Sequence, residues 1–518
     1  MEQRQREFKG DLQSAHPGTG GKVETSDDPA LAKRGTLSGM AYRPRFATVP
    51  LAGKWSWIPL AWVLLGATAT AADSDKRLID AVKNQDRNLA RTLIAAQVDV
   101  NTSQADGATA FHWAMHWGDI ESARLLIQGG ARVNATNDYG VTPLILACGS
   151  GESAGVPMLL EAGADPDKAL PTGETPLMTA SRSGKRAAVQ ALLEYGADVG
   201  AKESAQEQTP LMWAAAERHA SVIQLLLDYG ADARARSTSG LTALLLSARQ
   251  GDLESARLLL AAGADVNGAA ADRLSPLLVA TVRNHARLAV LLLDRGADPN
   301  AEGPGFTPLH WAAGLWETEL TGPRGIDTAR DEEWRALRGI SEGKLELITA
   351  LLEHGANPNA AIVRPPQRVG FTRGGLNLVG ATPFVVAAGA ADAALMRLLV
   401  SRGADPRLPT RENTTPLMAA AGVGRVAAES SVSEARAFEA VMLALELGGE
   451  VTASNNAGDT ALHGAASMRS DRIVQFLVEK GAQVNVKNKR GQTPLSNARG
   501  STTADLLRKL GAEPADAK

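Results

Sequence analysis

One short string of residues recurs along this chain at nearly constant intervals. The string is Thr-Pro-Leu or a close relative, and most copies start 32 to 34 residues apart. The copies start at Thr109, Thr142, Thr175, Thr209, Thr242, Ser275, Thr307, Thr382, Thr415, Thr460 and Thr493. A segment of this length cannot bury an apolar face by itself, so successive units must stack on one another. The chain is therefore expected to fold as a repeat solenoid.

Each unit reads as two short helices followed by a loop. The Thr side chain can accept hydrogen bonds from the first free amides of a helix, and Pro fits the first turn because no amide partner is needed there. Small residues such as Ala214–Ala216 follow, which allow this first helix to pack closely. A leucine-rich second helix, for example around Arg257–Leu260, ends at a glycine such as Gly263, the residue that most easily adopts a left-handed cap.

The 33-residue period and the T-P-L-H-x-A pattern resemble the ankyrin repeat. The resemblance covers residues 73–518 and includes a first unit at 74–101 that lacks the Thr-Pro-Leu start. It implies an all-α repeat fold, an ankyrin solenoid of about 12 helix-turn-helix units joined by hairpin-like loops. Units of this length fill the whole region, which leaves no room for a separate catalytic domain.

The period breaks in three consecutive units, which are units 8 to 10. Counting residues within each unit places inserted segments at 314–341, 361–378 and 422–436. The first contains Trp316 and an excess of acidic residues, and the second contains arginines and no acid. Insertions in repeat proteins often map to the binding face, so these segments would enlarge a binding groove. The alternative is a tolerated surface loop, because lengthening a loop costs little entropy.

In the ankyrin family, ligands are usually held by the hairpin tips and by the exposed end of the first helix. The resemblance therefore implies partner contacts at Asp106, His116, Trp117, Asp138, Tyr139, Glu174, Arg182, Glu217, Arg249, Arg283 and Phe306. The inserted segments add Trp316, Arg364, Arg368 and Arg373. Trp117 and Tyr139 are expected to contribute most, because aromatic residues and Arg dominate interface hot spots. The alternative for these two side chains is partial burial against neighbouring units.

Few residues favour catalysis or metal binding. His112 and His116 have the i, i+4 spacing that can bind a metal, but no third ligand lies near them in the sequence. His112 also occupies the T-P-L-H position, where the ankyrin histidine usually bonds backbone within the stack. Cys148 is the single cysteine, which excludes a disulfide within the chain and fits a packed apolar residue. We therefore expect no metal, no cofactor and no catalytic residue.

The first 72 residues differ from the repeats. Residues 1–54 are rich in Gly, Pro and charge, and they are expected to be disordered. Residues 55–72 form an uncharged run that ends in Ala69-Thr70-Ala71, the pattern of a secretory signal peptide. An uncleaved membrane anchor is the alternative, since a run of this length can just span a bilayer. If translation starts at Met40, residues 1–39 are not translated and the leader has an ordinary length.

The overall charge argues against one class of partner. Acidic residues (57) and basic residues (54) nearly balance, so the whole chain has no electrostatic attraction to nucleic acid or to an anionic membrane.

The patterns favour a non-enzymatic protein–protein interaction scaffold, an exported, periplasmic or secreted bacterial ankyrin-repeat protein. We expect a monomer that binds a protein partner through its concave face and inserted loops. The alternatives are a scaffold anchored to the inner membrane by residues 55–72, and an enzyme or small-molecule site in the insertions of units 8–10.

One unit departs from the pattern of the second helix. Pro157 lies inside the expected second helix of unit 3, after Gly151 and Gly155. Because proline lacks an amide donor and fits only the first helical turn, we expect this helix to begin late, at Pro157 itself. Unit 3 is therefore the predicted weak point of the stack.

Overall fold

The computed structural model describes residues 76–150, 154–271, 273–314, 343–365, 376–425, 432–498 and 500–514. The chain divides into two parts, Met1–Thr68 and Ala69–Lys518, and every described residue belongs to the second part. The described ranges contain 24 helices and no strand. Two isolated β-bridges, Ser103–Thr109 and Ser454–Thr460, lie in loops that precede a first helix. The all-α repeat fold expected from the sequence is confirmed.

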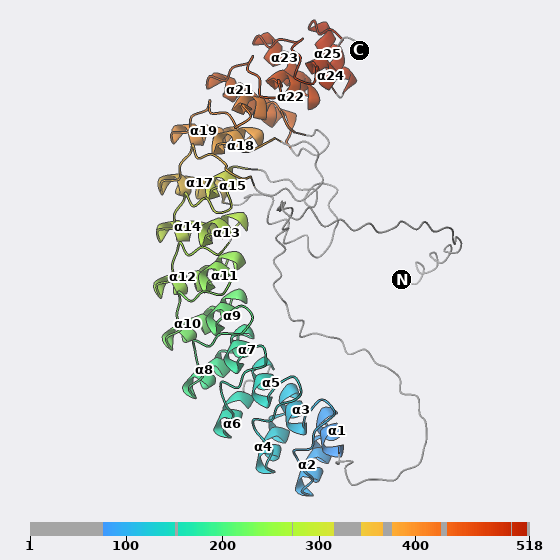
Figure 1. The fold of residues 1–518 in the computed structure, drawn as a ribbon, viewed down its shortest axis with the longest axis vertical. Coiled ribbons are helices and arrows are strands. Elements are labelled where there is room, and N and C mark those ends of the chain that lie inside the picture. Colours follow the sequence, from blue (N-terminus) through green and yellow to red (C-terminus); the bar gives the residue numbers. More distant parts are fainter. Residues whose placement is uncertain are drawn as a thin grey trace, which may run out of the picture. The chain divides into compact units, whose positions relative to one another are not determined.

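The helices form pairs, and each pair is one repeat unit (Figure 1). The first helices of units 1 to 12 are α1 (Arg77–Lys83), α3 (Ala110–Trp117), α5 (Pro143–Gly149), α7 (Pro176–Arg182), α9 (Pro210–Ala216), α11 (Ala243–Gln250), α13 (Pro276–Val282), α15 (Pro308–Ala313), α18 (Pro383–Gly389), α20 (Pro416–Ala420), α22 (Ala461–Ser467) and α24 (Pro494–Asn497). The second helices are α2 (Arg87–Ala95), α4 (Ile120–Gln128), α6 (Gly155–Glu161), α8 (Arg186–Glu194), α10 (Ala220–Asp228), α12 (Leu253–Ala261), α14 (Ala286–Asp294), α17 (Lys344–Glu353), α19 (Ala393–Ser401), α21 (Glu434–Glu446), α23 (Asp471–Glu479) and α25 (Ser501–Lys509).

Successive pairs stack so that helices of the same kind are neighbours. Figure 1 shows α7, α9, α11 and α13 side by side, with α8, α10, α12 and α14 in a second row, and the contacts between elements agree. The alanines predicted to permit this packing are buried, since Ala214 and Ala215 are 0% exposed. The leucines of the second helices close the core from the other side, as Leu226 and Leu259 do. The stacking buries a continuous apolar layer that no single unit could form.

The Thr-Pro start works as its chemistry predicts. In α5, the Oγ1 of Thr142 accepts the Ile145 amide at 3.2 Å, and Pro143 occupies the first turn. The T-P-L-H histidine adds a second bond, because the Nδ1 of His112 accepts the Thr109 amide at 3.2 Å. The Nε2 of His112 then donates to the Val141 carbonyl oxygen of the next unit at 3.0 Å. The backbone role expected for His112 is confirmed.

A ladder of side-chain amides joins the loops that follow the second helices. The Nδ2 of Asn134 donates to the Gly163 carbonyl oxygen at 3.0 Å, and its Oδ1 accepts the Asp165 amide at 2.8 Å. The same pair of bonds recurs from Asn101, Asn267, Asn300, Asn359 and Asn485. Each asparagine satisfies one donor and one acceptor of the following unit, which fixes the spacing between units.

The second helix of unit 3 is short, as expected, although its start differs by two residues. Helix α6 begins at Gly155 rather than at Pro157, which lies in its first turn. It has 7 residues, whereas the neighbouring α4 and α8 have 9 each. A proline in the first turn needs no amide partner, so the helix can start before it. Among described elements, α6 packs on α5 and α8 and less extensively on α4.

The first and third insertions fall between the two helices of a pair, and the second falls between two pairs. Residues 314–341 lie in the chain between α15 and α17, and residues 361–378 lie between α17 and α18. Residues 422–433 lie between α20 and α21, but the predicted insertion at 422–436 extends too far, because its last three residues belong to the first turn of α21. Most of the first two insertions and residues 426–431 of the third lie outside the described residues, as do residues 1–54 and 55–72. In the described part of the chain, no helix is long and apolar enough to cross a membrane.

Candidate protein interface

Three aromatic side chains contact one another at the end of α3. The rings of Trp113 and Trp117 stack with centroids 6.5 Å apart, and His116 lies edge-on to both at 5.7 and 4.7 Å. The i, i+3 and i, i+4 spacings bring these side chains to one helix face. We refer to these three residues as the aromatic cluster. Trp117 is 46% exposed, and His116 is also exposed, so the cluster presents a preformed apolar surface.

The inner side of the cluster is held by neighbouring polar groups. The Nζ of Lys83 in unit 1 lies 4.9 Å from the Trp113 ring centroid, a cation–π contact. The Nε1 of Trp113 donates to the Gln104 Oε1 at 3.3 Å. Neither Trp113 nor Lys83 was among the contact residues expected from the sequence. The i, i+4 spacing of Trp113 from Trp117 could have identified the first, and the position of Lys83 in the adjacent unit could have identified the second.

Hairpin loops carry the next predicted contacts. The Asp138 amide donates to the Asp106 carbonyl oxygen at 2.9 Å, which ties the loop of unit 3 to that of unit 2. Tyr139 follows and is 70% exposed, the largest exposure among the large hydrophobic side chains described. Its amide donates to the Asn137 Oδ1 at 3.1 Å. The backbone is thus fixed while the Tyr139 ring faces solvent.

Two predicted contacts of unit 4 bind each other. The Nη2 of Arg182 lies 3.1 Å from the Glu174 Oε1, and the Thr179 hydroxyl donates to the same oxygen at 2.8 Å. The Arg182 guanidinium also stacks over Trp213 of unit 5, with its Cζ 4.7 Å from the ring centroid. Only 28% of the Arg182 side chain and 15% of the Glu174 side chain remain exposed. This pair therefore joins units 4 and 5 and presents little surface to a partner.

The remaining predicted contacts differ in exposure. Glu217 is exposed, whereas Arg249 and Arg283 are half-buried. Phe306 is 6% exposed and stacks on Trp311 with centroids 5.8 Å apart, so it belongs to the core of unit 8. The expectation that Phe306 lies at an exposed hairpin tip is wrong, because the following ring covers it.

Among the residues predicted from the insertions, one is described. Arg364 is exposed, and its amide donates to the Gly305 carbonyl oxygen at 3.1 Å. Trp316, Arg368 and Arg373 lie outside the described residues.

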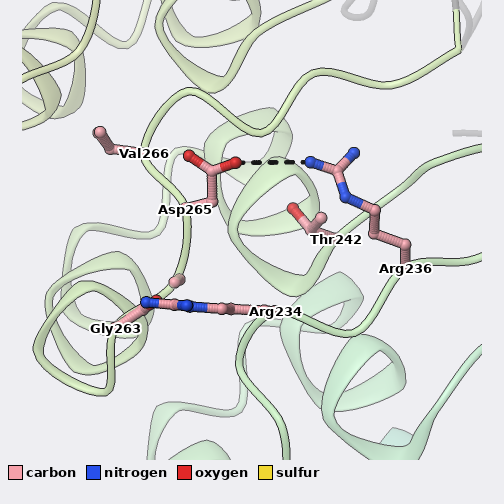
Figure 2. Close-up of a pocket in the computed structure, with 7 residues that line it drawn as sticks. Arg234, Arg236, Thr242, Gly263, Asp265 and Val266 are labelled. Carbon is pink, nitrogen blue, oxygen red and sulfur yellow. Dashed lines mark hydrogen bonds and ion pairs between the residues drawn. The ribbon is translucent and has the colours of Figure 1, made fainter.

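A groove of about 550 Å³ lies between the loops of units 5 and 6 (Figure 2). Arg234 takes the place that asparagine has in the ladder, and its Nε donates to the Gly263 carbonyl oxygen at 2.8 Å. The Arg236 Nη2 faces the Asp265 Oδ2 at 3.5 Å, and its Nη1 donates to the Ala269 carbonyl oxygen at 2.8 Å. Both guanidinium groups therefore bridge unit 5 to unit 6.

The cysteine and the histidine considered above for catalysis or metal binding, Cys148 and His112, are both buried in the stack. Burial raises the pKa of the Cys148 thiol, which opposes formation of a nucleophilic thiolate. Burial also lowers the pKa of His112, against the opposing effect of its backbone hydrogen bonds. Within the ranges that the structure describes, no three His, Cys, Asp or Glu side chains are grouped so that they could hold a metal ion.

Comparisons with known proteins agree with this geometry. A family model described as "Ankyrin repeats (3 copies)" matches residues 78–169, 177–270, 244–317 and 431–517. A second model, "Ankyrin repeat", matches residues 305–362. The chain is similar to the crystal structure of the human ASB11 ankyrin repeat domain, with 29% identity and a TM-score of 0.39 over 43% of this chain and 98% of that chain. No curated protein matches the sequence.

Proposed function

Because this chain belongs to the ankyrin repeat family, we propose that it is a non-enzymatic scaffold that binds a protein partner. Ankyrin repeats generally mediate protein–protein interactions. The stacked units present a preformed surface, so little side-chain ordering opposes association. Binding of this kind depends on shape and charge complementarity, and it involves no chemical reaction.

The aromatic cluster is the observation that carries this proposal. Aromatic residues make up 4% of the chain, yet Trp113, His116 and Trp117 contact one another on a single exposed helix end. Tyr139 projects from the hairpin of the next unit. Rigid aromatic side chains bury large areas at low entropic cost and are enriched at interface hot spots. We place the main partner contacts on Trp117 and Tyr139.

Paired substitutions test this placement. The double variant Trp117→Ala and Tyr139→Ala should lose most of the partner captured from extracts by the wild-type chain. A matched control is available, because Tyr195 (48%) and Tyr229 (43%) are similarly exposed but end the second helices α8 and α10. Changing both control residues to Ala should leave capture unchanged. Equal capture by the two double variants would place the interface elsewhere.

The inserted segments are proposed as additional contacts. Three insertions in consecutive units would enlarge the binding surface there. A variant lacking residues 315–338 should capture a smaller partner set than the wild-type chain. An identical partner set from both proteins would show that this insertion is a tolerated loop.

We also propose that the protein is exported. The uncharged run at 55–72 after Lys54, with small residues at Ala69 and Ala71, supports a cleaved signal peptide. N-terminal sequencing of the mature protein tests this directly. A mature chain that begins near residue 73 is expected, and one that retains 55–72 would favour an anchored scaffold instead.

A further inference from the structure

One rung of the asparagine ladder is incomplete, where a rung means the two bonds made by one ladder side chain. At the complete rung of Asn267, the Nδ2 donates to a glycine carbonyl oxygen of the next unit and the Oδ1 accepts a backbone amide two residues further on. Between units 5 and 6, Arg234 stands in place of the asparagine and supplies donors only. Its Nε replaces the donor, but no acceptor bonds the Asp265 amide within the described ranges of the chain. This rung therefore leaves one backbone amide open.

The backbone at this rung has its usual form. The Arg234 amide donates to the Asp232 Oδ1 at 2.8 Å, and the Asn300 amide donates to the Asp298 Oδ1 at the same distance in a complete rung. The loop of unit 5 therefore holds residue 234 where other units hold their asparagine. The open amide results from the chemistry of the side chain and not from a displaced loop.

The open amide belongs to a residue that lines the groove between units 5 and 6 (Figure 2). In this groove the Arg236 Nη2 lies 3.5 Å from the Asp265 Oδ2, and the Oδ1 of Asp265 accepts the Asn267 amide at 3.0 Å. Among the described residues, the guanidinium of Arg234 is bonded only to the Gly263 carbonyl oxygen. The one carboxylate of the groove is thus engaged by Arg236, and no carboxylate engages Arg234.

A carboxylate already fills the same acceptor position at another rung. Between units 3 and 4, Asp167 stands in place of the asparagine, and its Oδ1 accepts the Asp198 amide at 2.9 Å. A carboxylate has two acceptor oxygens, so a carboxylate entering the incomplete rung can accept the Asp265 amide with one oxygen and an Arg234 Nη with the other. The ladder itself therefore shows that a carboxylate fits this position.

We infer that the groove between units 5 and 6 binds an aspartate or glutamate side chain of the protein partner. This inference rests on the proposed function, and it names one chemical group of the partner. The groove of about 550 Å³ is much larger than a carboxylate, since one water molecule takes about 30 Å³ of the liquid. Residues on either side of the acid therefore fit as well, and Ala264 and Val266 offer them an apolar wall.

A phosphate group suits this site less well. A phosphate monoester carries nearly two charges and three acceptor oxygens, whereas the incomplete rung offers one amide and one guanidinium. The Asp265 carboxylate also lines the groove, and it repels a dianion more strongly than it repels a single charge. The donors present match the two oxygens and one charge of a carboxylate.

Fluorescence anisotropy with labelled peptides tests the chemistry of the ligand. The probe is a Ser-Gly-Glu-Gly-Ser peptide, and the matched control has Gln in place of Glu. A phosphoserine peptide and free acetate test the other anions. The full chain should bind the Glu peptide at least about tenfold more tightly than the Gln peptide, because hydrogen bonds to a charged acceptor are stronger.

Hydrogen exchange at single-residue resolution tests the position of the site. In the free protein, the Asp265 amide should exchange faster than the Asp298 amide, whose acceptor is the Asn267 Oδ1, after correction for sequence. Saturation with the Glu peptide should slow exchange at Asp265 and leave exchange at Asp298 unchanged. This comparison uses two equivalent amides of neighbouring rungs in the same molecule.

The substitution Arg234→Asn separates binding from stability. Asparagine at this position supplies both a donor and an acceptor, as it does at the complete rungs. The variant should protect the Asp265 amide without ligand, unfold at the same or a higher temperature, and bind the Glu peptide at least about tenfold more weakly. If Arg234 were only a structural bridge, asparagine would replace it with no loss of binding.

A control with the same change of charge is available in unit 9. Arg407 precedes Thr415 by eight residues, as Arg234 precedes Thr242, and its Nε lies 3.5 Å from the Asp405 Oδ1. Arg407→Asn therefore removes one positive charge from the corresponding position of another unit. This variant should bind the Glu peptide like the wild-type chain.

Other outcomes overturn the inference. These are no binding of the Glu peptide, equal binding of the Gln peptide, tighter binding of the phosphoserine peptide, displacement of the Glu peptide by an equal concentration of acetate, and equal loss of binding in the Arg234 and Arg407 variants. Partner capture that depends on Trp117 and Tyr139 but is unchanged in Arg234→Asn would also overturn it. That last result would leave the scaffold function intact, so the two proposals fail separately.

Discussion

The Nε2 of His310 donates to the Ala360 carbonyl oxygen, 2.9 Å away. The same nitrogen lies 3.2 Å from the Ala381 carbonyl oxygen, and the Nδ1 accepts the Thr307 amide at 3.1 Å. Ala360 and Ala381 stand on either side of the insertion at 361–378. One buried ring therefore joins the start of unit 8 to both ends of an inserted loop. This explains how a long segment can leave and re-enter the stack without separating units 8 and 9.

This arrangement predicts acid sensitivity in unit 8. Burial lowers the pKa of His310 to about 4, although its backbone hydrogen bonds oppose the shift. Because the unfolded chain binds this proton more readily, the stabilisation is complete above about pH 6.5 and is lost as the pH falls towards 4. The loss is about 3 kcal/mol over that range. Hydrogen exchange in α15, corrected for the intrinsic effect of pH, should show easier opening at low pH.

A substitution provides the control for that experiment. His310→Asn should remove most of the acid sensitivity of α15. Helix α3 should retain its own sensitivity, since burial also lowers the pKa of His112. Acid-insensitive exchange of α15 in the wild-type chain would contradict the role given to His310.

A second prediction concerns an ion pair that joins α17 to α19. The Lys344 Nζ lies 2.8 Å from the Asp392 Oδ2, with 16% and 20% of the two side chains exposed. Burial tends to raise the pKa of Asp392, but the hydrogen bond and charge of Lys344 outweigh it and lower the pKa. Lys344→Met would leave this carboxylate partly buried without its cation. We expect a loss of about 2 kcal/mol in urea unfolding.

The matched control is an exposed pair nearby. Arg397 and Glu439 lie 2.9 Å apart with 55% and 56% of their side chains exposed. Arg397→Met should change stability by less than about 0.5 kcal/mol, because exposed ion pairs contribute little. Equal effects of the two substitutions would mean that the pair at Lys344 has no special role.

The third prediction concerns local stability in unit 3. Helix α6 is shorter than α8, and it packs less closely on the preceding second helix, α4, than on the following one, α8. Its amides should exchange faster than those of α8 at the same pH, since opening it exposes less apolar surface. Hydrogen exchange measured by mass spectrometry resolves the two segments. Peak protection over residues 152–160 would refute the weak point.

The fourth prediction concerns the left-handed residue after each first helix. Gly184 has a φ of 68°, and the equivalent residue of unit 9 is Ala391 with a φ of 51°. Ala391→Gly should stabilise the protein by up to about 1 kcal/mol, because it removes strain that exceeds the added freedom of the unfolded chain. Gly184→Ala should destabilise it by about 2 kcal/mol, since the new Cβ would meet the His219 ring. Thermal unfolding of both variants tests the opposite signs.

The sequence predicted the repeat units well because their signals are local. Thr142 and Pro143 cap and start a helix within four residues, and Gly263 ends another within one turn. The predicted start of α6 was two residues too late, because a proline is compatible with several positions in the first turn of a helix. Trp113 was not predicted as a member of the aromatic cluster, although its i, i+4 spacing from Trp117 places both side chains on one helix face.

Contact residues depend on neighbouring units, which the pattern of one unit does not contain. Tyr139 and Phe306 both precede a first helix, yet one is 70% exposed and the other 6%. The difference arises because Trp311 stacks on Phe306, while no equivalent ring covers Tyr139 among the described residues. Arg182 likewise fits an exposed helix end by its position, but Trp213 of the next unit holds it against Glu174.

The sequence by itself determined the architecture. A regular period, helix caps and glycine stops act within single units, so their physical effect is independent of what stacks on them. Only the tertiary structure decided which side chains reach solvent. Exposure is set by the neighbouring units, through contacts such as those of the His219 ring with the Arg182 carbonyl oxygen and of the His285 ring with the Arg249 carbonyl oxygen. These contacts connect residues more than 30 positions apart, so the sequence of a single unit does not contain them.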